Sequence, residues 1–198
     1  MILPNQLTTL RIILSPAFLI LFLSENVFYR QMSFVVFLIA ALTDWYDGWL
    51  ARKFNYITDW GRFMDPLADK ILVSTAFFAY VIIDKINLWL VLIIVIRDFA
   101  VTGLRILGEF KKIPLHTSFS AKIKTFLQMG FIYFLLLSDF IVISNFEDNL
   151  SEFIKKNFID NFTVLNYAML IIALITVYTG VEYFWKSRKV LKKLFKFN

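Results

Sequence analysis

Long apolar runs, separated by short polar segments, dominate the chain. A membrane-spanning helix needs about 20 mostly apolar residues, and six stretches meet that requirement. We predict spans at roughly 6–24, 32–51, 63–83, 87–107, 121–144 and 163–184. The longest connection runs from Asn145 to about Asn161. The pattern predicts an all-α, polytopic membrane bundle of six transmembrane helices, in one domain covering residues 1–198.

Composition supports lipid as the solvent of this bundle. The 198 residues are 59% hydrophobic, whereas soluble domains are usually nearer half apolar. The chain has no cysteine, which excludes disulfides and thiolate zinc sites. Its one histidine, His116, argues against histidine-based metal sites and Ser-His-Asp chemistry. The first apolar run lacks a basic leader and a cleavage site, so we expect it to be retained as a span.

Basic residues are concentrated on alternate connections. They follow spans two, four and six, at Arg52, Lys53, Arg62, Lys111, Lys112, Lys186, Arg188, Lys189, Lys192, Lys193 and Lys196. By the positive-inside rule, both termini and the second and fourth connections are expected on the cytoplasmic side of a cell membrane. The net charge of +6 indicates contact with anionic lipid headgroups. Nucleic acid is not an expected partner, because no soluble basic segment is interleaved with aromatic residues.

The ionisable residues that are the main candidates for function lie inside four of the predicted spans. They are Asp44, Asp47, Asp65, Asp69, Arg97, Asp98, Arg105, Lys122 and Lys124. A charge at membrane depth costs several kcal/mol unless it is paired or hydrated, so each is a candidate functional group. All lie towards the predicted cytoplasmic side. A reactive centre there suits a substrate whose acyl chains lie in lipid and whose headgroup lies at the interface.

The aspartates form two stripes on successive helices. Helical residues three and four apart share a face, which aligns Asp44 with Asp47 and Asp65 with Asp69. Four carboxylates cannot share a low-dielectric pocket as bare anions. All-oxygen ligands favour Mg²⁺ or Mn²⁺, and four acids suffice to hold two ions. The alternative is that the acids pair with Arg52, Arg62 and Lys70.

The spacing of this segment is specific. The pattern D-x2-D-G-x2-A-R-x8-G-x3-D-x3-D is met by Asp44, Asp47, Gly48, Ala51, Arg52, Gly61, Asp65 and Asp69. It resembles the signature of the CDP-alcohol phosphatidyltransferases. Segments around Pro4–Arg11, Ile96–Arg105, Ala121–Thr125 and Gly180–Trp185 are similar to the bacterial phosphatidylglycerophosphate synthases within that family. One departure is Ala121, where those synthases usually have glycine.

The resemblance implies roles for the motif. Asp44, Asp47, Asp65 and Asp69 would be metal ligands, and Asp69 would also be the general base. Gly48, Ala51, Arg52 and Gly61 would bind the CDP-lipid, with Arg52 able to pair bidentately with diphosphate oxygens. Asn5 and Thr8 are expected to add polar contacts, although a helix cap explains Asn5 equally well. The resemblance also implies a homodimer.

The basic residues of spans four and five suggest the acceptor. The dianionic phosphate of glycerol 3-phosphate requires clustered cations, and Arg97, Arg105, Lys122 and Lys124 are the candidates. Lys122 and Lys124 point to nearly opposite helix faces, so we expect only one to reach the pocket. An ion pair with Asp98 is the alternative for Arg97, although adjacent helical residues do not face each other.

The sequence therefore predicts a metal-dependent enzyme of phospholipid biosynthesis in a bacterial cell membrane. It would transfer a phosphatidyl group from CDP-diacylglycerol to glycerol 3-phosphate. The same chemistry with inositol phosphate or phosphatidylglycerol as acceptor is one alternative. A divalent-cation transporter is an alternative of another class, because acids in two spans could line an ion path.

Overall fold

The computed structural model describes residues 3–54, 59–111, 113, 119–144 and 148–194. Some helical residues within these ranges have side chains that are not described. Six of them carry site predictions made above, which therefore lie outside the described side chains: Asn5, Asp47, Gly48, Ala51, Arg52 and Arg62.

Helices account for nearly all of the described residues, and no strand occurs among them. The long helices are α1 (Leu3–Phe22), α2 (Val27–Phe54), α3 (Asp59–Ile82), α4 (Leu88–Phe110), α5 (Phe119–Ser144) and α7 (Phe162–Leu194). Each predicted span coincides with one of these six helices, which confirms the all-α prediction. α3 begins four residues before the predicted span. Pro66 therefore lies beyond the first turn of this helix.

The connection after α5 contains structure that the hydrophobic pattern did not predict. It holds α6 (Asp148–Ile154) and the π-helical segment η1 (Lys155–Ile159). Phe158 makes edge contacts with Phe134 of α5 and with Phe153 of α6. A seven-residue helix is marginal alone, and this aromatic packing against α5 explains its formation.

Three helices are long and apolar enough to cross a membrane among the residues that the structure describes. Their qualifying windows are Val27–Asp44, Phe119–Ser144 and Phe162–Arg188, and Gln6–Phe22 is a shorter apolar helix. Charged residues interrupt the apolar stretches of α3 and α4. The chain therefore has the character of an integral membrane protein, and the count of six spans stays a prediction.

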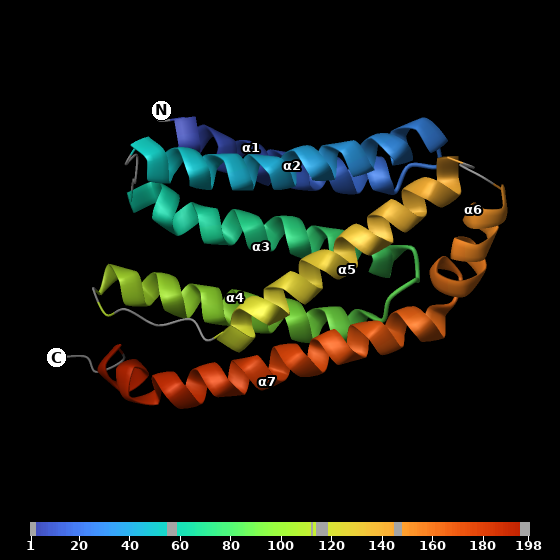
Figure 1. Cartoon of the computed structure of the whole chain (residues 1–198). Coiled ribbons are helices and arrows are strands. Elements are labelled where there is room, and N and C mark those ends of the chain that lie inside the picture. Colours follow the sequence, from blue (N-terminus) through green and yellow to red (C-terminus); the bar gives the residue numbers. More distant parts are fainter. Residues whose placement is uncertain (1–2, 55–58, 112, 114–118, 145–147, 195–198) are drawn as a thin grey trace.

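Consecutive long helices run in alternating directions between the two ends of the bundle (Figure 1). α1, α2 and α3 lie together on one side, α4 and α7 lie on the other, and α5 crosses obliquely between the two groups. The starts of α1, α3 and α5 and the ends of α2, α4 and α7 lie in the left half of Figure 1. This shared end is the one at which the sequence concentrates its basic residues and its aspartate motif.

Aromatic packing holds α1 against α2 and α3. The rings of Phe18 and Phe37 lie 5.4 Å apart between centroids, and those of Phe22 and Tyr80 lie 5.0 Å apart. All four side chains are fully buried or nearly so. Because α1 is fixed at this core, the polar residues nearer its N-terminus are held beside the acidic residues of α2 and α3.

Candidate active site

The first polar cluster lies where α1, α2 and α3 meet. Arg11 of α1 is fully buried, and its Nη1 lies 2.7 Å from Oδ1 of Asp44 on α2. Thr8, one turn earlier on α1, donates a hydrogen bond from its hydroxyl to Oδ1 of Asp65 on α3. Residues three apart share a helix face, so α1 presents a cation and a hydroxyl to the two acidic helices together.

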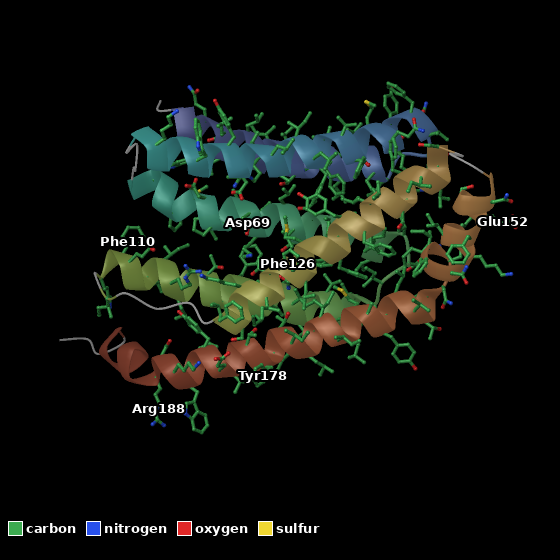
Figure 2. The ribbon with its side chains drawn as sticks, viewed as in Figure 1. Asp69, Phe110, Phe126, Glu152, Tyr178 and Arg188 are labelled. Carbon is green, nitrogen blue, oxygen red and sulfur yellow. The ribbon has the colours of Figure 1, made fainter. Side chains whose placement is uncertain are left out.

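Asp69 lies one turn beyond Asp65 on the same helix (Figure 2). Its Oδ2 lies 3.0 Å from Nζ of Lys70. Asp44 is within electrostatic range of both Asp65 and Asp69. Asp44 of α2 is therefore near Asp65 and Asp69 of α3, and we call these three carboxylates the acidic cluster. Pairing of the acids with basic side chains, the alternative weighed above, is observed for Asp69 with Lys70.

The oxygen-only donor set fits a hard cation such as Mg²⁺. About 48% of the Asp44 side chain and 29% of the Asp69 side chain are exposed, which leaves both carboxylates accessible to a ligand. Among the described side chains, no group of three or more Asp, Glu or His residues is close enough to hold a metal ion. The carboxylate of Asp47 lies outside that set, so the metal site stays a prediction.

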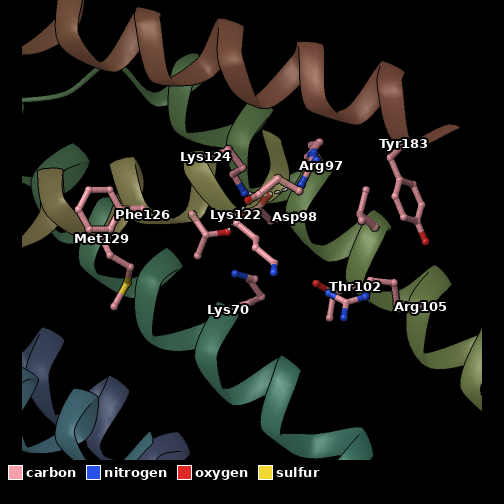
Figure 3. A pocket seen from close by; sticks show the side chains of 13 residues that line it. Lys70, Arg97, Asp98, Thr102, Arg105, Lys122, Lys124, Phe126, Met129 and Tyr183 are labelled. Carbon is pink, nitrogen blue, oxygen red and sulfur yellow. Dashed lines mark hydrogen bonds and ion pairs between the residues drawn. The ribbon is translucent and has the colours of Figure 1, made fainter. Parts of the chain in front are cut away.

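The second polar feature is a pocket of about 530 Å³ between α3, α4, α5 and α7. Basic side chains from three helices line it (Figure 3): Lys70, Arg97, Arg105, Lys122 and Lys124. Asp98 is the acidic residue among the described lining residues, and Thr102 and Tyr183 add hydroxyl groups. Five cations and one carboxylate give the pocket a strongly positive field suited to a dianion. We call this feature the basic pocket.

Asp98 organises the buried side of the basic pocket. It is buried on α4 and accepts a hydrogen bond from the ammonium of Lys124, which is also buried, on α5. Nη1 of Arg97 lies 3.3 Å from the same carboxylate. The ion pair between Arg97 and Asp98, the alternative considered for Arg97, is therefore present.

The structure brings all four predicted acceptor residues to the basic pocket. The expectation that only one of Lys122 and Lys124 would reach it is wrong, because both line it. Lys124 reaches back to Asp98 along the wall, whereas the exposed Lys122 extends towards Lys70 (Figure 3). A four-carbon stem lets a lysine whose Cα faces away still place its ammonium over the opening.

The acidic cluster and the basic pocket adjoin each other at α3. Asp69 belongs to the cluster and the next residue, Lys70, lines the pocket. A carboxylate, which can accept a proton, and a pocket lined by cations, which can bind a phosphate, are thus joined by one ion pair.

Sequence reasoning missed three residues of this region. Arg11 was given no role, although a charged residue in an apolar run is itself a functional signal. Lys70 was considered only as a partner for an acid, and Tyr183 only as part of a resemblance. Nothing in the spacing of α7 indicates that Tyr183 lines the pocket, because that depends on how α7 packs against α4.

Most of the chain matches one family of known proteins. Residues 1–179 match the family model described as CDP-alcohol phosphatidyltransferase. The chain is also similar to the CDP-diacylglycerol–glycerol-3-phosphate 3-phosphatidyltransferase of Bacillus subtilis (strain 168). The two are 35% identical over 202 residues, covering 96% of this chain and 97% of the relative.

Proteins with the same name from other bacteria show comparable similarity. The one from Rickettsia felis is 33% identical over 188 residues, covering 94% of this chain and 96% of the relative. The one from Wigglesworthia glossinidia brevipalpis is 40% identical over 149 residues, covering 71% and 79%. The similarity to the Bacillus and Rickettsia felis proteins includes both the aspartate helices and the helices that form the basic pocket.

Proposed function

The chain belongs to the CDP-alcohol phosphatidyltransferase family, and from this premise we propose that it transfers a phosphatidyl group from CDP-diacylglycerol to glycerol 3-phosphate. The products are phosphatidylglycerophosphate and CMP. The observation that carries the choice of acceptor is the basic pocket beside Asp69. An acceptor without a phosphate would leave the net positive charge of this pocket uncompensated.

In the proposed reaction, Asp69 accepts the proton of the primary hydroxyl of glycerol 3-phosphate. The resulting oxygen attacks the β-phosphorus of CDP-diacylglycerol and forms a new P–O bond. The bond from that phosphorus to the oxygen bridging the two phosphates breaks, and CMP leaves with the bridging oxygen. Arg97, Arg105, Lys122 and Lys124 hold the acceptor phosphate, which fixes the hydroxyl beside the base.

The acidic cluster supplies the second half of the proposed site. Two Mg²⁺ or Mn²⁺ ions, held by Asp44, Asp47, Asp65 and Asp69, would offset the charge of the diphosphate and of the leaving CMP. Arg52 and the small residues Gly48, Ala51 and Gly61 are proposed to bind the CDP moiety, with Asn5 and Thr8 as further polar contacts. Arg11 supports this half by holding the carboxylate of Asp44.

The test uses purified protein in detergent with Mg²⁺, CDP-diacylglycerol and radiolabelled glycerol 3-phosphate. We expect CMP release that requires the acceptor and falls about 10³-fold or more in Asp69→Asn, since general-base catalysis is worth about 10²–10⁴-fold. Inositol phosphate and phosphatidylglycerol serve as competing acceptors. Equal CMP release from the wild type and from Asp69→Asn would refute the assignment of the base. Faster turnover with another acceptor would change the substrate.

We also propose that six helices span the membrane, that both termini and the site face the cytoplasm, and that the protein is a homodimer. The first two proposals are supported by the alternating helices and the one-sided basic residues. The dimer is supported by family membership alone. Chemical cross-linking in lipid nanodiscs tests it, and a purely monomeric product at saturating cross-linker would refute it.

A further inference from the structure

The side chain of Arg97 crosses from α4 to α7 and passes over Gly180. A Cβ atom at Gly180 would lie 3.2 Å from Cγ of Arg97, 3.3 Å from its Nε and 3.9 Å from its Cδ. Carbon atoms at optimal separation are about 3.5–4.0 Å apart, so a Cβ at Gly180 would force the Arg97 side chain to move by a few tenths of an ångström. The bare backbone of Gly180 therefore provides the space that the arginine side chain occupies.

The residue before Gly180 fixes the end of the same side chain. Nη2 of Arg97 donates a hydrogen bond of 2.9 Å to Oγ1 of Thr179, which is fully buried. The hydroxyl of Thr179 donates its own proton to the carbonyl oxygen of Thr176, at 3.0 Å. Because that proton is committed, the oxygen of Thr179 faces Arg97 as an acceptor.

The other side of the guanidinium is held by Asp98, 3.3 Å from Nη1. A guanidinium is planar and presents its donors in a fixed fork. Two of its nitrogens are therefore set by two different helices, α4 and α7. The position of Arg97 in the lining of the basic pocket therefore depends on both helices, and α7 carries none of the acceptor residues predicted from sequence.

We propose that Thr179 and Gly180 are positioning residues for the acceptor site. They set the orientation of Arg97, and through it the affinity of the basic pocket for the phosphate group of the acceptor. The inference rests on the proposed function, and it assigns to α7 a part in substrate specificity. A glycine that only allows α4 and α7 to pack closely would affect stability and leave acceptor affinity unchanged.

The main experiment compares Gly180→Ala with Gly130→Ala and Gly103→Ala. All three are glycines inside long helices, but a Cβ at Gly130 or Gly103 meets nothing within 4 Å. We expect Gly180→Ala to raise the KM for glycerol 3-phosphate about tenfold, equivalent to about 1.4 kcal/mol. The KM for CDP-diacylglycerol should stay within about twofold of the wild-type value. The two control variants should leave both KM values unchanged.

A double-mutant cycle separates positioning from general disturbance. Arg97→Ala removes the three atoms that a Cβ at Gly180 would approach. Gly180→Ala should therefore have no further effect on the acceptor KM in the Arg97→Ala background. Additive effects of the two substitutions would contradict the proposal, as would a KM for Gly180→Ala equal to that of Gly130→Ala.

Thr179 offers an independent test with a conservative rescue. Thr179→Val keeps the shape of the side chain and removes the acceptor oxygen, so the acceptor KM should rise. Thr179→Ser keeps the oxygen and should restore a near-wild-type KM. Equal KM values for the valine and serine variants would show that the hydroxyl does not orient Arg97.

If the proposed function is wrong, the wild-type protein will release no CMP with glycerol 3-phosphate, which distinguishes this failure from failure of the positioning role. The positioning role would then be tested with inorganic phosphate alone, through its effect on thermal unfolding of the detergent-solubilised protein. Phosphate should raise the Tm of the wild type and of Gly130→Ala more than that of Gly180→Ala. Equal shifts in all three would overturn the inference.

Discussion

At the residue scale, Asp98 balances the charges buried at the base of the basic pocket. Its carboxylate contacts both Lys124 and Arg97, and the side chain of Lys124 is only 2% exposed. An ammonium group at such a position is costly without a partner, because it has lost its hydration shell. The same pairing leaves Lys122 and Arg105 as the exposed cations that meet an incoming ligand first.

We predict that Asp98→Asn destabilises the protein by about 3–5 kcal/mol, because it leaves a buried cation without its counter-charge. Adding Lys124→Met should recover part of this loss, since the unpaired charge is then removed. Reversible unfolding in mixed micelles, followed by circular dichroism, measures the free energies of unfolding. A double variant less stable than Asp98→Asn alone would contradict this account of the pair.

At the element scale, α5 joins the two groups of helices, and an ion pair secures its far end. Arg30 of α2 donates from Nε and Nη2 to the two carboxylate oxygens of Asp139 on α5, at 3.0 and 2.9 Å. The guanidinium also lies 5.2 Å from the ring centroid of Phe22 on α1. Asp139, which lies towards the predicted outer side of the membrane, is thus paired with Arg30 inside the bundle. This pairing gives no support to the alternative function of a divalent-cation transporter.

This ion pair lies near the end of the bundle opposite the acidic cluster, so stability and activity should respond separately. We predict that Arg30→Met lowers the free energy of unfolding by about 3 kcal/mol or more, because Asp139 is left buried and unpaired. The specific activity of the folded variant, measured well below its Tm, should remain within about twofold of wild type. Adding Asp139→Asn should restore part of the stability. A selective loss of kcat with unchanged stability would contradict a purely structural role.

At the scale of the whole molecule, the starts of α3 and α5 and the ends of α2 and α4 lie towards one end of the bundle (Figure 1). The acidic cluster and the basic pocket are built mainly from these parts of the helices. A substrate with acyl chains in lipid and a charged headgroup in water requires such a position. The sidedness of that end is open to a direct test, because the chain contains no cysteine. Single introduced cysteines therefore report their own position without background labelling.

We predict that, in intact cells, a membrane-impermeant maleimide labels Glu25→Cys, between α1 and α2, and leaves Lys111→Cys, after α4, unlabelled. Labelling of Lys111→Cys should appear only after the membrane is permeabilised. Both variants should retain transferase activity, which serves as the control for correct folding. The opposite labelling pattern would invert the proposed orientation and place the site outside the cell.

The sequence alone determined the helices and the acidic motif, because both depend on local information. Apolar runs of span length predicted the position of each long helix. The spacing of the residues from Asp44 to Asp69 predicted which of them share a face of their helix. Family membership follows from the same spacing. These properties need no knowledge of how one helix crosses another. The short α6 was missed because its stability depends on Phe158 of η1, whose ring contacts both Phe153 of α6 and Phe134 of α5.

Only the tertiary structure decided which side chains meet. That Arg11 faces Asp44, that Lys122 and Lys124 both reach one pocket, and that Arg97 rests on Gly180 all depend on helix crossings. Long, flexible basic side chains can reach several neighbours from one backbone position, so helical periodicity alone does not select among them. The packing of α3, α4, α5 and α7 against one another determines which neighbour each basic side chain reaches. It thereby brings cations from separate helices together around one pocket.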